Sequence, residues 1–237
     1  MREIASKIKL ISYTKNPEKV ISAAVRQCYS SKSAAQLMQK ITPQKRGELI
    51  RQVISSGHTS TIEHVSFTFT IEGVSRSMTH ELVRHRIASY SQQSQRYVSA
   101  ADFKYIVPPT IRSNKKLLKK YKDELILIKN LYEEMVNDGI PKEDARFILP
   151  NACETKIVVT MNARSLFNFL ARRMCNRAQW EIRFVAHQMH KLLMKVAPNV
   201  FKFAGPTCKT EDICWEGERN CGIPAKLKKI KLLSHVK

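Results

Sequence analysis

The sequence lacks several features that would place it in well-known protein classes. No apolar run reaches the roughly 18 residues of a membrane span, and the first residues, MREIASKIKLISYT, contain no apolar leader segment. The motifs G-x-G-x-x-G, G-x-x-x-x-G-K-[ST] and G-x-S-x-G are all absent. We therefore expect a cytoplasmic protein that is not a Rossmann dinucleotide-binding protein, a P-loop protein or a serine hydrolase.

Cysteine occurs without the pattern of a disulfide framework. The six cysteines are scattered through a chain that is too large to need such a framework, so we expect reduced thiols. Only Cys208, Cys214 and Cys221 are clustered, and a tetrahedral zinc site would need a fourth ligand such as His235. We therefore expect no metal. The sequences around Cys28, Cys153 and Cys175 do not argue for a nucleophile.

Positive charge is abundant. Lys and Arg total 41 against 20 Asp and Glu, which gives a formal net charge of +21 in 237 residues. Such a charge favours polyanionic partners or anionic substrates, although part of the excess lies in a lysine-rich C-terminal tail. A nucleic-acid-binding protein without catalytic activity is one interpretation. Against it, aromatic residues make up only 8% and are not regularly interleaved with the basic ones.

The periodicity of apolar residues predicts an α+β fold. Residues 65–71 alternate as a half-buried strand ended by Gly73, and residues 156–161 form a β-branched strand. Helical spacing predicts further elements at 17–29, 44–55, 75–84, 115–137, 141–149, 162–173 and 179–196. We expect one domain over residues 1–204, with a central, mostly antiparallel sheet flanked by helices, and a basic tail over residues 205–237.

The segment from Arg84 to Arg96, RHRIASYSQQSQR, is the most unusual part of the chain. It offers many hydrogen-bond donors and no acidic residue, which suits phosphates and the edge of a heterocycle. No apolar period is present from Ile87 onwards, so we expect a loop. Composition alone favours an anion-binding loop and a solvated polar turn about equally. A zinc protease is excluded because His80 and His85 are five residues apart and lie on different faces of a helix.

A second polar group lies in the predicted helix after Asn162. Asn162, Ser165, Asn168 and Arg172 follow one another at steps of three or four residues, which places them along one face. Taken alone, this stripe is typical of an exposed helix surface.

These blocks together resemble the flavin-dependent thymidylate synthases. The family has R-H-R followed by S and by S-x-R, and the matching residues here are Arg84, His85, Arg86, Ser89, Ser94 and Arg96. Matching blocks also occur upstream, at Gly57-His58 and Glu63-His64, and downstream, around Arg146, Asn162 and Arg173. The resemblance therefore covers most of residues 57–181.

The resemblance implies a homotetramer that converts dUMP to dTMP at sites on subunit interfaces. FAD would carry the hydride, NADPH would be the reductant and methylenetetrahydrofolate would donate the carbon. The implied flavin-binding residues are Ser60, Glu63, Arg84, His85, Arg86, Gln92, Asn162, Arg164 and Asn168. The implied dUMP-binding residues are Glu81, Arg84, Gln92, Gln93, Ser94, Gln95, Arg96, Arg146 and Arg173. Arg173 is the expected catalytic residue, because its permanent charge would stabilise an ionised pyrimidine.

Overall fold

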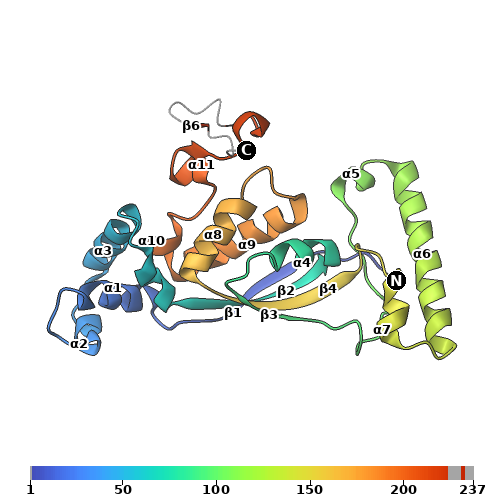
Figure 1. Cartoon of the computed structure of the whole chain (residues 1–237), viewed down its shortest axis with the longest axis horizontal. Coiled ribbons are helices and arrows are strands. Elements are labelled where there is room, and N and C mark those ends of the chain that lie inside the picture. Colours follow the sequence, from blue (N-terminus) through green and yellow to red (C-terminus); the bar gives the residue numbers. More distant parts are fainter. Residues whose placement is uncertain (1, 224–230, 233–237) are drawn as a thin grey trace. The chain divides into compact units, whose positions relative to one another are not determined.

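A computed structural model describes residues 2–223 and 231–232 of the chain (Figure 1). The chain forms two units, and the four strands of its main sheet run through both. The first unit consists of Met1–Ile8, Thr70–Arg84 and Tyr90–Val159, and the second of Lys9–Phe69, His85–Ser89 and Thr160–Lys237. The domain boundary expected at residue 204 stays a prediction.

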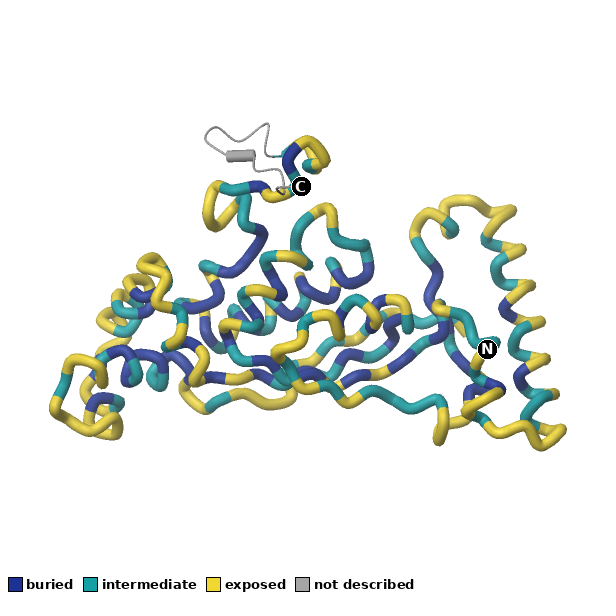
Figure 2. The backbone as a smooth tube through the Cα atoms, in the orientation of Figure 1, coloured by how far each residue is buried: buried dark blue, intermediate teal, exposed yellow. Residues whose placement is uncertain are grey.

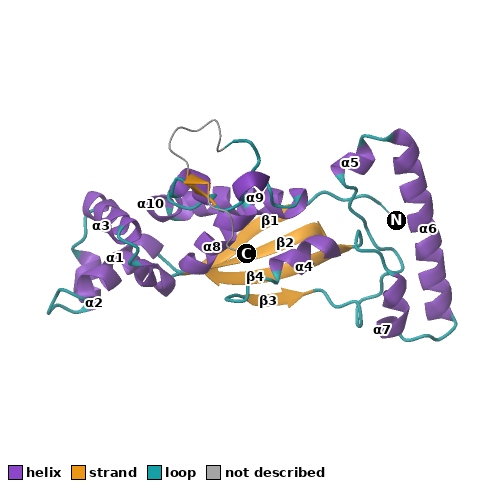
Figure 3. Ribbon diagram, turned by 45° about the horizontal axis from the view of Figure 1, so that its top comes forward, coloured by secondary structure: helices purple, strands orange, loops and turns teal. Residues whose placement is uncertain are grey.

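The main sheet has the strand order β1-β2-β4-β3 (Figure 3). Its strands are β1 (Lys7–Tyr13), β2 (Ser66–Ser75), β3 (Ser89–Gln92) and β4 (Glu154–Asn162). The Thr68 and Thr160 hydroxyls are 2.9 Å apart, and the Gly73 amide donates to the Glu154 carboxylate at 3.2 Å. The start of β2 thus lies beside the end of β4, which is the antiparallel arrangement. The predicted α+β fold with an antiparallel sheet is confirmed.

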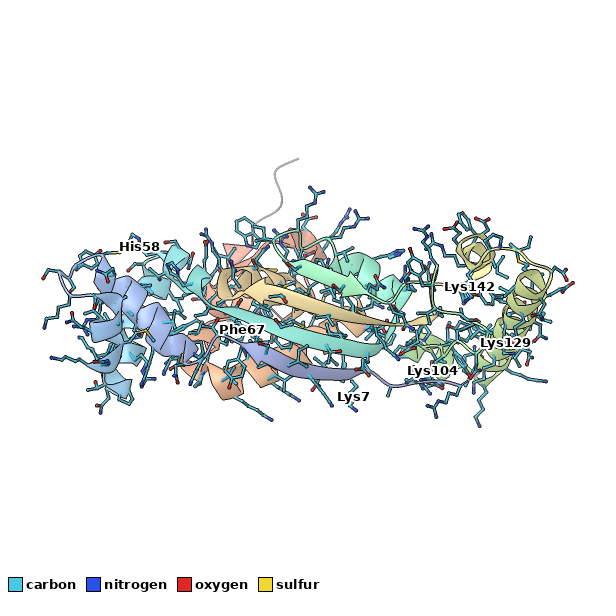
Figure 4. All side chains as sticks on the ribbon, turned by 90° about the horizontal axis from the view of Figure 1, so that it is seen from below. Lys7, His58, Phe67, Lys104, Lys129 and Lys142 are labelled. Carbon is cyan, nitrogen blue, oxygen red and sulfur yellow. The ribbon has the colours of Figure 1, made fainter. Side chains whose placement is uncertain are left out.

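Strand β2 shows how the alternating sequence builds the core. Phe67, Phe69 and Ile71 are fully buried, whereas the intervening threonines are only half-buried. Buried and half-buried stretches alternate along the strands of the sheet in Figure 2. Phe67, labelled on β2 in Figure 4, packs edge-on against Phe201 with ring centroids 5.2 Å apart. The predicted end at Gly73 is wrong, because β2 continues to Ser75. Glycine inside a strand can mark a close approach of another backbone as well as a break.

The second unit contains most of the helices. Its elements after β1 are α1 (Pro17–Gln27), α2 (Ala34–Gln39), α3 (Pro43–Ser55), η1 (Thr59–His64), α8 (Ala163–Arg173), α9 (Trp180–Val196), α10 (Pro198–Phe201), α11 (Thr207–Thr210), β5 (Ile213–Cys214), η3 (Gly217–Arg219) and β6 (Lys231–Leu232). Strand β5 pairs with β6 in parallel. The predicted helices near 17–29, 44–55, 162–173 and 179–196 are confirmed. Strand β1 and helix α2 were not expected.

The first unit contains α4 (Arg76–Leu82), α5 (Pro109–Arg112), α6 (Lys115–Asn137), α7 (Lys142–Ala145) and η2 (Arg146–Ile148). Helix α6 has the predicted bounds. The single helix expected over 141–149 is wrong, since it divides into α7 and a 3-10 turn. Pro150 forces Leu149 into an extended conformation, with ψ of 134°, and so ends the helix early. None of the described helices is long and apolar enough to cross a membrane.

The loop expected from Ile87 to Arg96 contains strand β3, so that prediction is wrong for residues 89–92. The Gln93 amide just beyond it donates to the Lys156 carbonyl of β4 at 2.9 Å. Serine and glutamine carry no apolar alternation, yet their backbone groups can still pair at the edge of a sheet. The polar segment is therefore held by backbone hydrogen bonds.

Candidate functional site

In the second unit, His85 and Arg173 meet although they are far apart in the sequence. Arg173 ends helix α8, and its Nε donates to His85 Nε2 at 3.0 Å. The His85 ring stands edge-on to Phe169, one helical turn earlier, with ring centroids 5.0 Å apart. Helix α8 begins where the Asn162 side chain accepts a hydrogen bond from the Ser165 amide at 2.8 Å. Two separate sequence blocks are thereby joined in one cluster.

The surroundings of His85 keep its ring neutral. Burial lowers the pKa of His85, and the positive charges of Arg173 and Arg172 add to this effect, so that the pKa is about 4. Because an arginine Nε can only donate, His85 Nε2 must accept, and the neutral ring therefore carries its proton on Nδ1. The ring is a neutral aromatic group among cations.

This lowered pKa predicts a pH dependence of stability. Between about pH 6.5 and pH 4 the unfolded chain binds a proton at His85 that the folded chain does not, so the free energy of unfolding falls as the pH falls. We expect His85→Asn to lose less stability than the wild-type chain when urea unfolding at about pH 7 is compared with about pH 5. Equal losses in the two proteins would contradict the prediction.

A second cluster in this unit joins α8 to η1. Arg164 Nη1 lies 2.5 Å from Glu63 Oε1, and both side chains are largely exposed. Ser60, Arg86 and Asn168 are also exposed. The structure thus brings Glu63 and Arg164 together, and their assignment to the flavin stays a prediction. The side chain of Asn162 instead serves as the helix cap.

In the first unit, the glutamines after the R-H-R motif point to a half-buried polar cluster. Gln92 Nε2 donates to the hydroxyl of Thr79 at 2.9 Å and to that of Thr155 at 3.2 Å, and both threonines are buried. Gln95 Nε2 lies 3.7 Å from Cys153 Sγ. These contacts fix the two side-chain amides, and a fixed amide can select the donors and acceptors of a heterocycle edge.

Two of the predicted nucleotide-binding arginines in this unit share one partner. Arg96 Nε donates to the Glu143 carboxylate at 2.7 Å, and Arg146 Nε donates to the Glu143 backbone carbonyl at 3.1 Å. Both guanidinium groups are therefore held at the start of α7. Glu143 was not among the predicted site residues, so its role in positioning two cations was missed.

The remaining predicted residues have mainly backbone or local contacts. The Arg84 amide donates to the Glu81 carbonyl at 3.3 Å, and Ser94 Oγ accepts from the Arg96 amide at 3.1 Å. Arg84 belongs to the first unit, whereas His85 and Arg86 belong to the second. Phe169 was not predicted as a site residue, and its contact with His85 has no signal in the sequence.

A cavity of about 760 Å³ lies beside the end of α8 in the second unit. Arg172, Arg173 and Arg177 line one part of it, and residues 203–208 and Trp215 line another. Glu211 and Glu216 line it as well, so its wall combines three arginines with two glutamates and with aromatic and thiol groups.

Comparisons with known proteins identify the family of this chain. Residues 9–199 match the family model described as thymidylate synthase complementing protein. The flavin-dependent thymidylate synthase of Clostridium tetani is 46% identical, with 95% of this chain and 97% of the relative covered. The one from Geobacter sulfurreducens is also 46% identical, with 94% and 97% covered.

A solved structure supports the fold separately. The crystal structure of a UMP/dUMP methylase PolB from Streptomyces cacaoi, bound with 5-Br dUMP, has a TM-score of 0.77 and covers 85% of this chain and 95% of its own. At 23% identity this likeness shows the fold alone. From the matched residues and the identity to its relatives, the chain belongs to the flavin-dependent thymidylate synthase family.

Proposed function

We propose that this chain methylates dUMP to dTMP, with FAD as hydride carrier, NADPH as reductant and methylenetetrahydrofolate as carbon donor. The observation that carries the proposal is the hydrogen bond from Arg173 to His85. It joins the R-H-R motif to the arginine at the end of α8, and these are the two blocks from which the family resemblance draws its flavin and uracil contacts. Both are in the region that the family model matches.

The residues of the second unit fit a flavin in their chemistry. Exposed Arg86 and Arg164 offer planar guanidinium groups that suit a pyrophosphate, and exposed Ser60 and Asn168 offer hydrogen bonds. Neutral His85 adds a ring that can lie near an isoalloxazine without adding charge. When bound, FAD would supply hydride to the pyrimidine. The chain's own residues would bind, orient and shield the reactants.

Arg173 would act on the nucleotide. His85 Nε2 accepts its Nε–H and so orients the guanidinium plane. A fixed, permanently charged group beside the uracil would stabilise negative charge on the ring and make its carbon nucleophilic. In the first unit, Arg96 and Arg146 are both held by Glu143, and their guanidinium groups suit the phosphate of dUMP.

A thiol nucleophile is not required by this proposal, and the chain's most buried cysteine is poorly suited to that role. Burial raises the pKa of Cys153 to about 11, so the thiol stays protonated near neutral pH. Its position near Gln95 suits a packing role. Activation of the uracil is therefore assigned to Arg173.

The family resemblance also supports a homotetramer whose active sites lie at subunit interfaces, with dUMP contacts from more than one chain, and a cytoplasmic location. The exposure of Arg84, Arg86 and Arg164 is compatible with ligand or subunit contacts. Size-exclusion chromatography with light scattering would measure the mass of the assembly in solution. A monomer that forms dTMP would contradict the proposed assembly.

The decisive experiment measures dTMP from dUMP with FAD, NADPH and methylenetetrahydrofolate, and repeats the assay with each omitted in turn. We expect a yellow protein, product only in the complete mixture, and tritium release from C5-labelled dUMP. A colourless protein that retains polynucleotide in a salt-dependent manner, with no product, would favour the nucleic-acid-binding alternative.

A further inference from the structure

Four of the six cysteines gather in the second unit, around the end of α8. Cys175, Cys208 and Cys214 line the same cavity. Cys221 Sγ lies 4.0 Å from the side-chain nitrogen of Asn176, the residue that follows Cys175. The remaining two cysteines stand apart, since Cys28 is exposed at the end of α1 and Cys153 belongs to the first unit.

These four thiols differ in their exposure to solvent. Cys214 is buried, Cys175 and Cys208 are half-buried, and Cys221 is exposed. Most of the group is therefore shielded from solvent beside the cavity.

The segment that carries three of these cysteines has little else to hold it. Helix α11 has four residues and β5 has two, and Cys214 is one of the few buried residues there. Gly217 and Gly222 have φ of 50° and 78°, a backbone conformation that favours glycine. The chain therefore turns both before and after Cys221. A short segment with so few buried side chains is the kind that a metal commonly stabilises.

We infer that Cys175, Cys208, Cys214 and Cys221 form a structural site for a zinc ion or a similar thiolate-binding divalent cation. Four cysteines satisfy the tetrahedral preference of zinc with no ligand left for substrate. Cys175 would supply the fourth ligand, for which the sequence offered only His235 as an example, and His235 lies outside the described residues. The bound ion would tie residues 205–223 to the end of α8, two residues beyond Arg173.

The thiols do not yet have the spacing of a loaded site. Among the described residues, no group of three or more His, Cys, Asp or Glu is arranged to hold a metal ion. Binding would therefore have to draw the sulfurs together by movement of the short elements α11, β5 and η3. Loss of thiol protons accompanies such binding, and the positive ion replaces the mutual repulsion of the thiolates with attraction.

The test uses the full-length chain purified without chelators, with zinc measured by mass spectrometry. We expect about one zinc per chain in the wild type and in the control Cys28→Ser, and at least a tenfold lower content in Cys208→Ser and Cys214→Ser. A wild-type zinc content no higher than that of Cys208→Ser would overturn the inference.

A variant that fails to fold would also lose zinc, so the wild-type chain is tested in a second way. After exchange with Co²⁺, tetrahedral thiolate ligation should give intense sulfur-to-cobalt charge-transfer bands and visible d–d bands. Their absence, or bands of an oxygen- and nitrogen-ligated ion, would overturn the inference even if zinc were present. Product formation is assayed separately, so failure here is distinguishable from failure of the proposed reaction.

Discussion

Replacing Arg173 with alanine will lower kcat for dTMP formation about 100- to 1,000-fold while the protein still binds flavin. This is the usual loss when one preorganised donor to a developing negative charge is removed. Arg173 is the arginine of α8 that donates to His85, and no water or lysine ammonium reproduces a guanidinium fixed in this way. Arg173→Lys is therefore expected to recover little of the rate.

Arg172 provides the matched control for this prediction. It precedes Arg173 on α8, is exposed and carries the same charge. Arg172→Ala should keep kcat within a few-fold of the wild type. If the two variants lose activity equally, the general positive field of the helix end, and not a specific contact, is responsible.

The pKa of His85 gives a second measurement on the same two variants, and a loss of activity through misfolding alone would not change it in the expected order. Arg173 and Arg172 both lower the pKa of His85, with Arg173 the larger of the two, after burial. In Arg173→Ala the His85 pKa should therefore rise towards its usual value, and in Arg172→Ala it should rise less. Imidazole proton chemical shifts followed against pH would measure both.

Local chemistry made much of this fold predictable. The 115–137 helix was found with its bounds because a long apolar period and a following glycine agree there. The start of α8 was found because Asn162 comes directly before its apolar period. Elements that depend on distant pairing were less accessible, and polar β3 is one example, since only β4 makes it a strand.

The site shows the same division. Residue types and spacing predicted which arginines would bind the nucleotide, but not which side chains hold those arginines in place. Glu143 could not be assigned to Arg96 because 47 positions separate them. Cys175 and Cys208, which line the same cavity, are also far apart in the sequence and could not be connected. His85 had a recognisable place in a motif, yet its neutrality comes from burial and two arginines of α8. These properties arise only once the chain is folded.

Gly73→Ala is expected to destabilise the first unit by about 3 kcal/mol, more than most single substitutions. Gly73 has φ of 65°, which disfavours any residue with a Cβ. A Cβ built there would lie 2.3 Å from the Ala5 carbonyl oxygen, and because this neighbour is backbone it cannot rotate away. Urea unfolding would measure the loss.

Gly139→Ala separates the two causes of that loss. Gly139 follows α6 with φ of 85°, yet a Cβ there would have no atom within 4 Å. Gly139→Ala should therefore lower the free energy of unfolding by only about 1 kcal/mol, the conformational penalty of a Cβ at positive φ. If both variants lose the same stability, the close approach to Ala5 contributes nothing. If Gly73→Ala loses more, the backbone contact at Gly73 fixes the end of β2, and with it Ser75, whose side chain caps α4 ahead of Arg84.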